Sequence, residues 1–287
     1  MDLCDLREIK PLLTRYGFHF SKSMGQNFLI DGSVPQAIAE ASGADETTAA
    51  LEIGPGIGPL TVQLARRAGK VAAVELDTAL LPVLAETLAD CPNVTVIPGN
   101  IMKLDLDALL AEHCGSLTPI VCANLPYNIT TPVLTRLLES RRFASITVMI
   151  QREVAKRICA RPNTGDYGAF TLLCQYYADC ELLFEVPPHC FYPAPKVTSA
   201  VVRMTSRSAP PAAVDSEARF FQVVRAAFLQ RRKKLLNGLS SAFSNQLTKE
   251  QLREALTACG LGENTRGEQL SLEQFAALSN VIGELLG

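Results

Sequence analysis

The segment Asn124-Leu-Pro-Tyr127 contains the residue types that hold a flat heterocycle by an exocyclic amine. The side-chain oxygen of Asn124 and the carbonyl of Pro126 can accept the two amine hydrogens, while the Tyr127 ring stacks on the heterocycle. Acceptors that draw these hydrogens out of the ring plane localise the lone pair of the amine for attack on a methyl group. The alternative interpretation of the segment is an Asn-Pro turn at the end of a strand.

A glycine-rich segment, EIGPGIGPLT (52–61), precedes this tetrapeptide in the chain. Gly54, Gly56 and Gly58 lack Cβ atoms, so a ligand can lie against the backbone. Taken alone, the pattern is compatible with a dinucleotide enzyme, a methyltransferase or a simple tight turn. Glu75 sharpens the prediction, because an acid at the end of the second strand is placed to bind a ribose diol by two hydrogen bonds.

The residues around the glycines favour S-adenosylmethionine over a cofactor that contains a pyrophosphate. A phosphate-binding loop needs a Lys or a free helix N-terminus, whereas here Pro59 begins the predicted helix and the acidic Glu52 precedes the loop. S-adenosylmethionine carries an amino group and a sulfonium, and both tolerate nearby carboxylates. We therefore expect S-adenosylmethionine as the cofactor.

The elements that must position these residues begin at about residue 48. Short apolar runs alternate there with longer amphipathic ones, a pattern typical of a parallel sheet covered by helices. Helices are predicted over residues 59–69 and 78–90, and strands over 49–53, 70–76, 93–100, 119–127 and 145–151. Ligands bind at the carboxyl ends of the strands in such sheets. The polar residues at these ends are Glu52, Glu75, Asn100, Asn124 and Gln151.

The chain changes character at residues 207–216, a segment rich in Pro, Ala and Ser that is typical of a linker. Before it, residues 180–186 and 199–205 predict an antiparallel hairpin around a proline-rich segment, because prolines are excluded from central strands. After it, apolar residues recur at helical spacing and no run predicts a strand. We expect an α/β domain over 1–206 and a smaller helical domain over 207–287.

The charge is nearly balanced, since 27 basic and 29 acidic residues leave a net charge of −2. This excludes a general polyanion binder, so any face that binds nucleic acid must be local. Two basic stretches qualify, residues 136–161 and residues 218–249. The second contains a run of four bases, Arg231, Arg232, Lys233 and Lys234. The alternative interpretation of both stretches is a solvated helix face.

Nine scattered cysteines, none in a C-x-x-C pair, and three histidines indicate reduced thiols rather than a disulfide framework or a metal site. No apolar run reaches the roughly 18 residues of a membrane span, and the charged first residues do not resemble a signal peptide. We therefore expect a cytoplasmic monomer that binds neither metal nor membrane.

Taken together, the motifs resemble those of the ribosomal RNA adenine dimethyltransferases. The segments that carry this resemblance are QNFL (26–29), EIGPGIGPLT (52–61), VELD (74–77), NLPY (124–127), VMIQREVAKRI (148–158) and FYPAPKVTSAVV (191–202). The tail AAFLQRRKKLLNGL (226–239) is similar to the C-terminal domain of the branch that modifies small-subunit rRNA. The resemblance covers nearly the whole chain, with its motifs in the family's order.

This resemblance implies a Rossmann-like, S-adenosylmethionine-dependent methyltransferase domain with a smaller all-helical C-terminal domain. The implied reaction converts two adjacent adenines in the 3′-terminal hairpin of small-subunit rRNA to N6,N6-dimethyladenine, with a role in small-subunit biogenesis. The positions implied for the cofactor are Asn27, Leu29, Gly54, Glu75, Asn100 and Asn124. Those implied for the target adenine are Asn124, Pro126, Tyr127 and Phe191, with Phe191 as a second stacking face.

Asn100 departs from the family pattern, which has an aspartate after the third strand. An amide at this position can still accept a hydrogen bond from the cofactor's adenine amine, but it carries no charge. Three other functions compete with the implied one. A large-subunit rRNA methyltransferase of the macrolide-resistance type is disfavoured by the basic tail, and a DNA adenine methyltransferase by Leu125. A non-catalytic ribosome-assembly factor is disfavoured by the intact glycines, Glu75 and NLPY segment.

Overall fold

The computed structural model describes residues 1–19, 26–230 and 233–287. The chain forms two compact units, one of residues 1–155 and 179–206, the other of residues 156–178 and 207–287. The predicted boundary at residue 207 is thus one of the places where the chain passes between units. Residues 156–178 pack with the C-terminal helices. As a division into functional domains, 1–206 and 207–287 stays a prediction.

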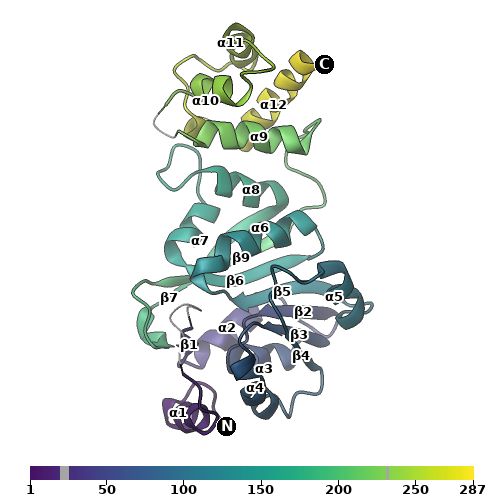
Figure 1. Cartoon of the computed structure of the whole chain (residues 1–287), viewed down its shortest axis with the longest axis vertical. Coiled ribbons are helices and arrows are strands. Elements are labelled where there is room, and N and C mark those ends of the chain that lie inside the picture. Colours follow the sequence, from purple (N-terminus) through teal and green to yellow (C-terminus); the bar gives the residue numbers. More distant parts are fainter. Residues whose placement is uncertain (20–25, 231–232) are drawn as a thin grey trace. The chain divides into compact units, whose positions relative to one another are not determined.

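The first unit is built on a seven-stranded sheet with the order β4-β3-β2-β5-β6-β9-β7 (Figure 1). Its strands are β2 (Thr48–Ile53), β3 (Lys70–Glu75), β4 (Val94–Pro98), β5 (Thr118–Asn124), β6 (Ser145–Gln151), β7 (Ala178–Val186) and β9 (Ser199–Ser206). The strands β2 to β6 pair in parallel, and β9 pairs antiparallel with β6. The predicted α/β fold class is confirmed, and the two predicted hairpin strands, β7 and β9, lie side by side.

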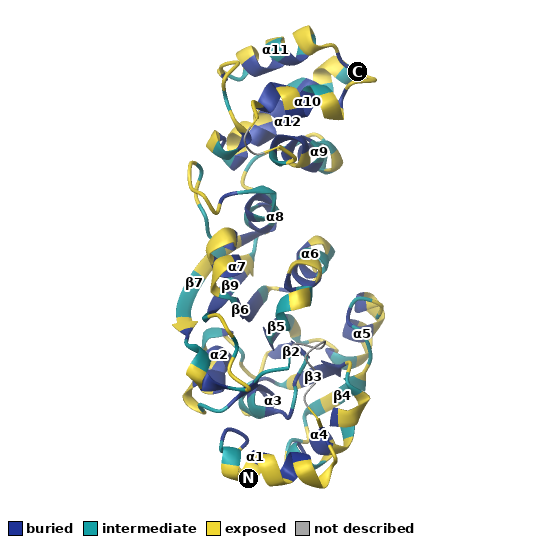
Figure 2. Cartoon of the chain, turned by 60° about the vertical axis from the view of Figure 1, so that its left-hand side comes forward, coloured by how far each residue is buried: buried dark blue, intermediate teal, exposed yellow. Residues whose placement is uncertain are grey.

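Helices connect the strands of this unit. They are α2 (Ser33–Ala41), α3 (Pro59–Ala65), α4 (Leu81–Thr87), α5 (Leu106–His113) and α6 (Thr130–Ser140), and α7 (Arg152–Ile158) begins in this unit and ends in the second. Every residue of the central strand β2 is buried (Figure 2). Apolar side chains of α2 and α3 pack on the sheet in one core cluster. Successive side chains of β2 point to opposite faces of the sheet, so the burial of all of them shows that both faces are covered, which explains the continuous apolar sequence of this strand.

The helix predicted over residues 59–69 ends earlier, at Ala65. The chain turns at Gly69, whose N–H donates to the Thr48 carbonyl at 3.0 Å. A Cβ on Gly69 would lie 2.5 Å from the Glu46 carbonyl oxygen, so only glycine fits this approach. The helix predicted over 78–90 begins as a 3₁₀ turn, η2 (Thr78–Leu80), before α4. Helix α4 then ends at Thr87, so both α-helices are shorter than the amphipathic patterns that predict them.

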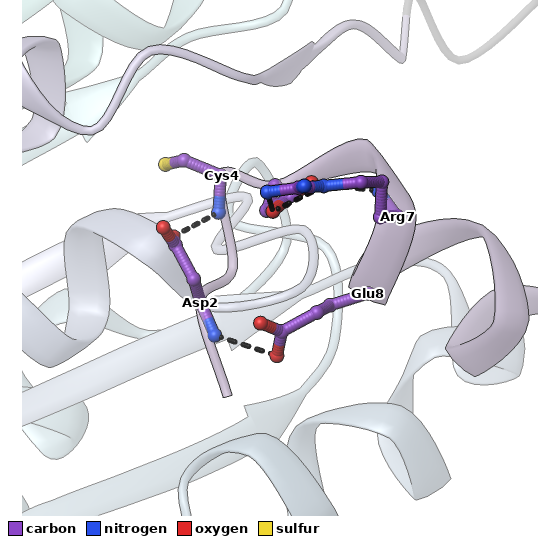
Figure 3. Close-up of polar contacts among 5 residues, drawn as sticks. Asp2, Cys4, Arg7 and Glu8 are labelled. Carbon is purple, nitrogen blue, oxygen red and sulfur yellow. Dashed lines mark hydrogen bonds and ion pairs between the residues drawn. The ribbon is translucent and has the colours of Figure 1, made fainter.

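A second, two-stranded sheet joins segments that the sequence patterns do not connect. Strand β1 (Phe28–Leu29) pairs antiparallel with β8 (Phe191–Tyr192), so that Leu29 lies opposite Phe191. The helix α1 (Leu6–Arg15) precedes it, and the Asp5 side chain caps that helix by accepting from the Arg7 N–H. Asp5 also forms an ion pair with Arg7. Figure 3 shows this N-terminal turn, where Glu8 accepts from the Asp2 N–H at 2.9 Å.

The second unit is helical. It contains α8 (Ala169–Tyr177), α9 (Glu217–Phe228), α10 (Leu235–Ala242), α11 (Lys249–Ala258) and α12 (Leu272–Leu286), with the 3₁₀ turn η5 (Gly267–Gln269). Its aromatic core includes Tyr176, which stacks on Phe220 with ring centroids 4.9 Å apart. Gly238 of α10 faces the Ala226 carbonyl of α9 so closely that a Cβ would lie 2.2 Å from that oxygen. Glycine therefore sets the α9–α10 spacing.

Within the described ranges, no helix combines the length and the apolar run that crossing a bilayer needs. In the same ranges, no three His, Cys, Asp or Glu side chains gather in a way that could hold a metal ion.

Candidate active site

A cavity of about 200 Å³ lies at the carboxyl ends of β2, β3, β4 and β5. It lies within the first unit. The residues that the sequence assigned to the cofactor and the target adenine all line it, namely Asn27, Leu29, Gly54, Glu75, Asn100, Asn124, Pro126, Tyr127 and Phe191. Parallel strands end at the same edge of a sheet, which is why residues up to 164 positions apart in sequence meet here.

The glycine loop between β2 and α3 forms one wall of the cavity. Gly54, Gly56 and Gly58 all have left-handed φ angles, of +70°, +62° and +96°. Other residues rarely adopt this conformation, and a Cβ on Gly56 would in addition lie 3.2 Å from the Phe28 ring. The loop therefore presents bare backbone to a ligand.

Glu75, at the end of β3, is held by the backbone around it. Its Oε1 accepts from the Asp77 N–H at 2.7 Å, and its Oε2 accepts from the Gly56 N–H at 3.3 Å. Burial raises the pKa of Glu75, and these two hydrogen bonds oppose that effect. Each carboxylate oxygen keeps a further lone pair, so the side chain can accept from two hydroxyls of a ribose without losing its position.

Glu52, at the base of the glycine loop, is only 1% exposed and also lines the cavity. Its Oε2 has no hydrogen-bond partner in the part of the chain that the structure describes. The pKa of Glu52 is raised to about 8, chiefly by burial; the Thr61 hydroxyl opposes the rise and the nearby charge of Glu75 adds to it. A buried acid that has one oxygen without a hydrogen-bond partner beside a cavity is stabilised in its ionised form when a cationic ligand binds there. S-adenosylmethionine is such a ligand.

Asn100 lines the cavity, but its side chain also shapes the turn after Gly99. The Oδ1 atom accepts from the Met102 N–H at 2.9 Å, and the Asn100 carbonyl accepts from the Lys103 N–H at 2.8 Å. The side chain thus stabilises the turn after Gly99 by a local bond to the backbone. A second lone pair on Oδ1 and the NH₂ group are left for a ligand.

The NLPY segment continues β5 into the 3₁₀ turn η3 (Tyr127–Ile129). The Leu125 N–H donates to the Met149 carbonyl at 3.1 Å, which fixes the segment to β6. The Asn124 side chain, in contrast, makes no hydrogen bond to any residue that the structure describes. An unpaired amide in a cavity is the feature expected of a group that binds a ligand.

The Pro126 carbonyl, assigned above as the second acceptor, is already engaged. It accepts from the Ile129 N–H at 3.2 Å and from the Thr130 hydroxyl at 3.2 Å. Both lone pairs are therefore used within the chain, and the carbonyl can accept from a ligand only after the Thr130 hydroxyl turns away. The sequence does not indicate this hydrogen bond, because a threonine hydroxyl at the start of a helix can point toward the preceding carbonyl or away from it.

The two rings assigned to stacking have different surroundings. Tyr127 is half-buried, and its hydroxyl is 2.7 Å from the Ser199 Oγ. Burial raises the pKa of Tyr127, while this hydrogen bond lowers it. Phe191 is only 3% exposed and belongs to the same core cluster as Leu29 and Cys190. Its position therefore fits a role in core packing as well as an edge contact with a base.

Of the four bases assigned to RNA, Arg231 and Arg232 lie outside the described residues. Lys233 and Lys234 are exposed, and Lys234 is the N-cap of α10. They belong to the second unit, whereas the cavity belongs to the first.

Sequence reasoning missed three residues that support the site. Gln26 donates to Asp77 at 2.8 Å, which ties the QNFL segment to the end of β3. Thr130 and Ser199 hold the NLPY segment, as described above. QNFL and VTS stand in the motifs quoted for the family resemblance, but nothing in their spacing indicates which side chains they contact.

Comparisons with known proteins agree on one family. A family model described as "Ribosomal RNA adenine dimethylase" matches residues 17–284. "Ribosomal RNA small subunit methyltransferase A" of Geobacillus thermodenitrificans (strain NG80-2) is 49% identical over 284 residues, which are 98% of this chain and 97% of the relative. The protein of the same name from Clostridium perfringens (strain SM101 / Type A) is 43% identical over 289 residues, 100% of this chain and 99% of the relative.

Two solved structures have the same fold. The crystal structure of the 23S rRNA methyltransferase ErmE matches with a TM-score of 0.68 and 27% identity, over 91% of this chain and 99% of that chain. A dimethyladenosine transferase from Plasmodium falciparum matches with a TM-score of 0.73 and 23% identity, over 87% of this chain and 95% of that chain.

Proposed function

The chain belongs to the ribosomal RNA adenine dimethylase family, and we propose that it dimethylates the N6 amines of two adjacent adenines in the 3′-terminal hairpin of small-subunit rRNA. The family makes the chain an S-adenosylmethionine-dependent rRNA adenine dimethyltransferase. The observation that best supports transfer to an adenine amine is the side-chain amide of Asn124. It lines the same cavity as the glycine loop and Tyr127 and makes no hydrogen bond to the described residues.

The residues of the cavity fit S-adenosylmethionine. The bare backbone of the glycine loop receives the ligand, and Glu75 accepts from the ribose hydroxyls. The buried carboxyl of Glu52 has one oxygen without a hydrogen-bond partner, and a cationic ligand beside it would favour its ionised form. When bound, S-adenosylmethionine supplies a methyl group that a sulfonium already makes electrophilic. The chain therefore has to position the two reactants rather than to activate the methyl group.

Asn124 orients the amine of the target adenine. Its Oδ1 accepts one N–H hydrogen, which directs the nitrogen lone pair toward the cavity. Tyr127 offers its ring face to the base, which must leave its stack to reach the cavity. Pro126 holds the turn between these two side chains by accepting from Ile129 and Thr130.

The small-subunit branch is favoured over the large-subunit branch by the relatives. Full-length proteins named for the small subunit share 43 to 49% of their residues with this chain, whereas the 23S rRNA enzyme shares 27%. We further propose that the partner is a small-subunit assembly intermediate in the cytoplasm, that Lys233 and Lys234 contact its phosphates, and that the enzyme acts as a monomer. The exposure of both lysines supports the contact with phosphate.

Mass spectrometry of rRNA tests this function in cells. Cells that lack the protein are expected to lose a pair of adjacent dimethyladenines near the 3′ end of small-subunit rRNA. The wild-type protein restores the pair, and Asn124→Ala does not. Dimethyladenines that persist in the small subunit and disappear from the large subunit would assign the protein to the other branch.

A further inference from the structure

We propose that Ser199 is a positioning residue for methyl transfer, because it holds the Tyr127 ring in the plane that stacks on the target adenine. The inference rests on the proposed function of the cavity and deepens it. Ser199 does not line the cavity. It acts through the hydroxyl of Tyr127, which lies 2.7 Å from its Oγ.

The Tyr127 hydroxyl is the attachment that defines the orientation of its ring. No aromatic ring among the described residues stacks on Tyr127, and the residue is half-buried. A tyrosine side chain has two rotatable bonds, and packing on one side leaves the second underdetermined. A hydrogen bond at the far end of the ring removes this freedom. A phenylalanine would fill the same space without that restraint.

Ser199 is suited to this task because its own position is rigid. It is 0% exposed and is the first residue of β9. In the antiparallel pairing of β9 with β6 it lies opposite Gln151, and the Arg152 N–H donates to the Thr198 carbonyl at 3.0 Å. The pairing of β9 with β6 thus fixes the backbone of Ser199, and burial restricts its side chain.

The two segments that this hydrogen bond joins, NLPY and the start of β9, both pair with strand β6. Asn124 lies opposite Met149 of β6, and the Leu125 N–H donates to the Met149 carbonyl. Ser199 lies opposite Gln151 of that strand. Strand β6 therefore serves as the common frame for the Asn124 amide and for the anchor of the Tyr127 ring. The geometry couples the acceptor for the amine to the ring that stacks on the base.

The test compares Ser199→Ala, Tyr127→Phe and the double variant by single-turnover methylation of a hairpin RNA. Each single variant is expected to lower the rate at saturating RNA and S-adenosylmethionine about fivefold, the effect of one hydrogen bond of roughly 1 kcal/mol. The double variant is expected to be no slower than either single variant, because all three lack the same bond. The dissociation constants for RNA and S-adenosylmethionine stay within about twofold of wild type, so the loss falls on kcat rather than on KM.

Ser206→Ala is the matched control. Ser206 ends the same strand, and its hydroxyl donates to the Phe143 carbonyl at 2.6 Å, away from the cavity. This variant loses a serine hydrogen bond from β9 and is expected to keep the wild-type rate. Equal slowing by Ser206→Ala and Ser199→Ala would show that both merely loosen the strand. A wild-type rate for Ser199→Ala, or multiplied losses in the double variant, would also overturn the proposal.

A second measurement separates this inference from the proposed function. In protein with ¹³C-labelled tyrosine, the Tyr127 Cζ resonance is identified by its disappearance in Tyr127→Phe. It is expected to shift in Ser199→Ala and not in Ser206→Ala, whether or not the RNA is the correct substrate. If the wild type fails to methylate the hairpin but the resonance shifts, the proposed function fails and the anchor stands. An unshifted resonance removes the anchor itself.

Discussion

The two sides of the cavity differ in how far the chain satisfies its own polar groups. On the cofactor side, Glu75 accepts two backbone N–H groups and Asn100 accepts one. On the target side, the Asn124 amide makes no hydrogen bond to the described residues. The backbone beside it is hydrogen-bonded, since the Leu125 N–H donates to the Met149 carbonyl and the Pro126 carbonyl accepts from the Ile129 N–H. The cofactor side is therefore shaped by folding itself, whereas the target side keeps one polar group free for the base.

This difference separates the consequences of substitution on the two sides. A residue that already serves the backbone affects folding and binding together when it is replaced. A residue whose side chain makes no hydrogen bond in the free protein affects mainly the reaction. Glu52 is a third case, since it is buried like a core residue but lacks a partner for one oxygen.

The largest effect on activity is expected for Asn124→Ala. Loss of the positioned acceptor should raise the barrier by about 3 kcal/mol, or slow transfer about a hundredfold. The melting temperature and the affinity for RNA should barely change, because folding forms no hydrogen bond to this amide among the described residues. Single-turnover methylation, thermal melts and RNA titration check this. A rate within threefold of wild type would show that the free amide has no part in transfer.

Glu52→Gln is expected to change the pH dependence of stability. The raised pKa of about 8 means that the folded protein keeps a proton on Glu52 that the unfolded chain releases above about pH 4.5. Wild-type stability therefore falls as pH rises from about 5 to 8, and the glutamine variant lacks this loss. Denaturant titrations should show equal stability at pH 5 and an advantage for Glu52→Gln of a few kcal/mol at pH 8.5. If the stability of the two proteins changes with pH in the same way, Glu52 is ionised in the folded protein and the prediction is wrong.

Tyr127→Ala and Phe191→Ala are expected to separate stacking from core packing. Phe191 is nearly inaccessible, so its loss should destabilise the fold by roughly 3 to 5 kcal/mol. Tyr127 is more open, so its loss should weaken productive binding of the base by roughly 1 to 3 kcal/mol at a smaller cost in stability. Thermal melts and single-turnover rates measured on the same samples compare the two. Normal methylation by folded Phe191→Ala protein would assign this ring to the core alone.

Asn100→Asp should have the smallest effect. The aspartate keeps the turn bond to the Met102 N–H and adds a charged acceptor for the adenine amine of the cofactor. A charged acceptor gains about 1 kcal/mol over a neutral one, so S-adenosylmethionine should bind up to about fivefold more tightly. Asn100→Ala should weaken binding by a similar factor and also lower the melting temperature. Equal dissociation constants for the three proteins in calorimetric titrations would restrict Asn100 to the turn.

The strand ends and the polar residues on them could be predicted from the sequence, because apolar runs and parallel topology decide both. The partners of those residues could not. The engagement of Pro126 by Thr130, the anchoring of Tyr127 by Ser199 and the pairing of Leu29 with Phe191 depend on how distant segments pack. The close approach of Gly69 to the Glu46 carbonyl also depends on packing that no local pattern encodes. Periodicity reports which face is buried, whereas it does not report what lies against that face.

The most direct test of the central claim counts the methyl groups that the purified protein transfers. The protein is incubated with S-adenosylmethionine and a hairpin RNA that carries the two adjacent adenines of the 3′ end of small-subunit rRNA, alone and within small subunits that lack the modification. Mass spectrometry of the digested RNA is predicted to find four methyl groups, two on each N6, and none with Asn124→Ala. Methyl groups on any other atom, or none with the wild-type protein on either substrate, would contradict the account.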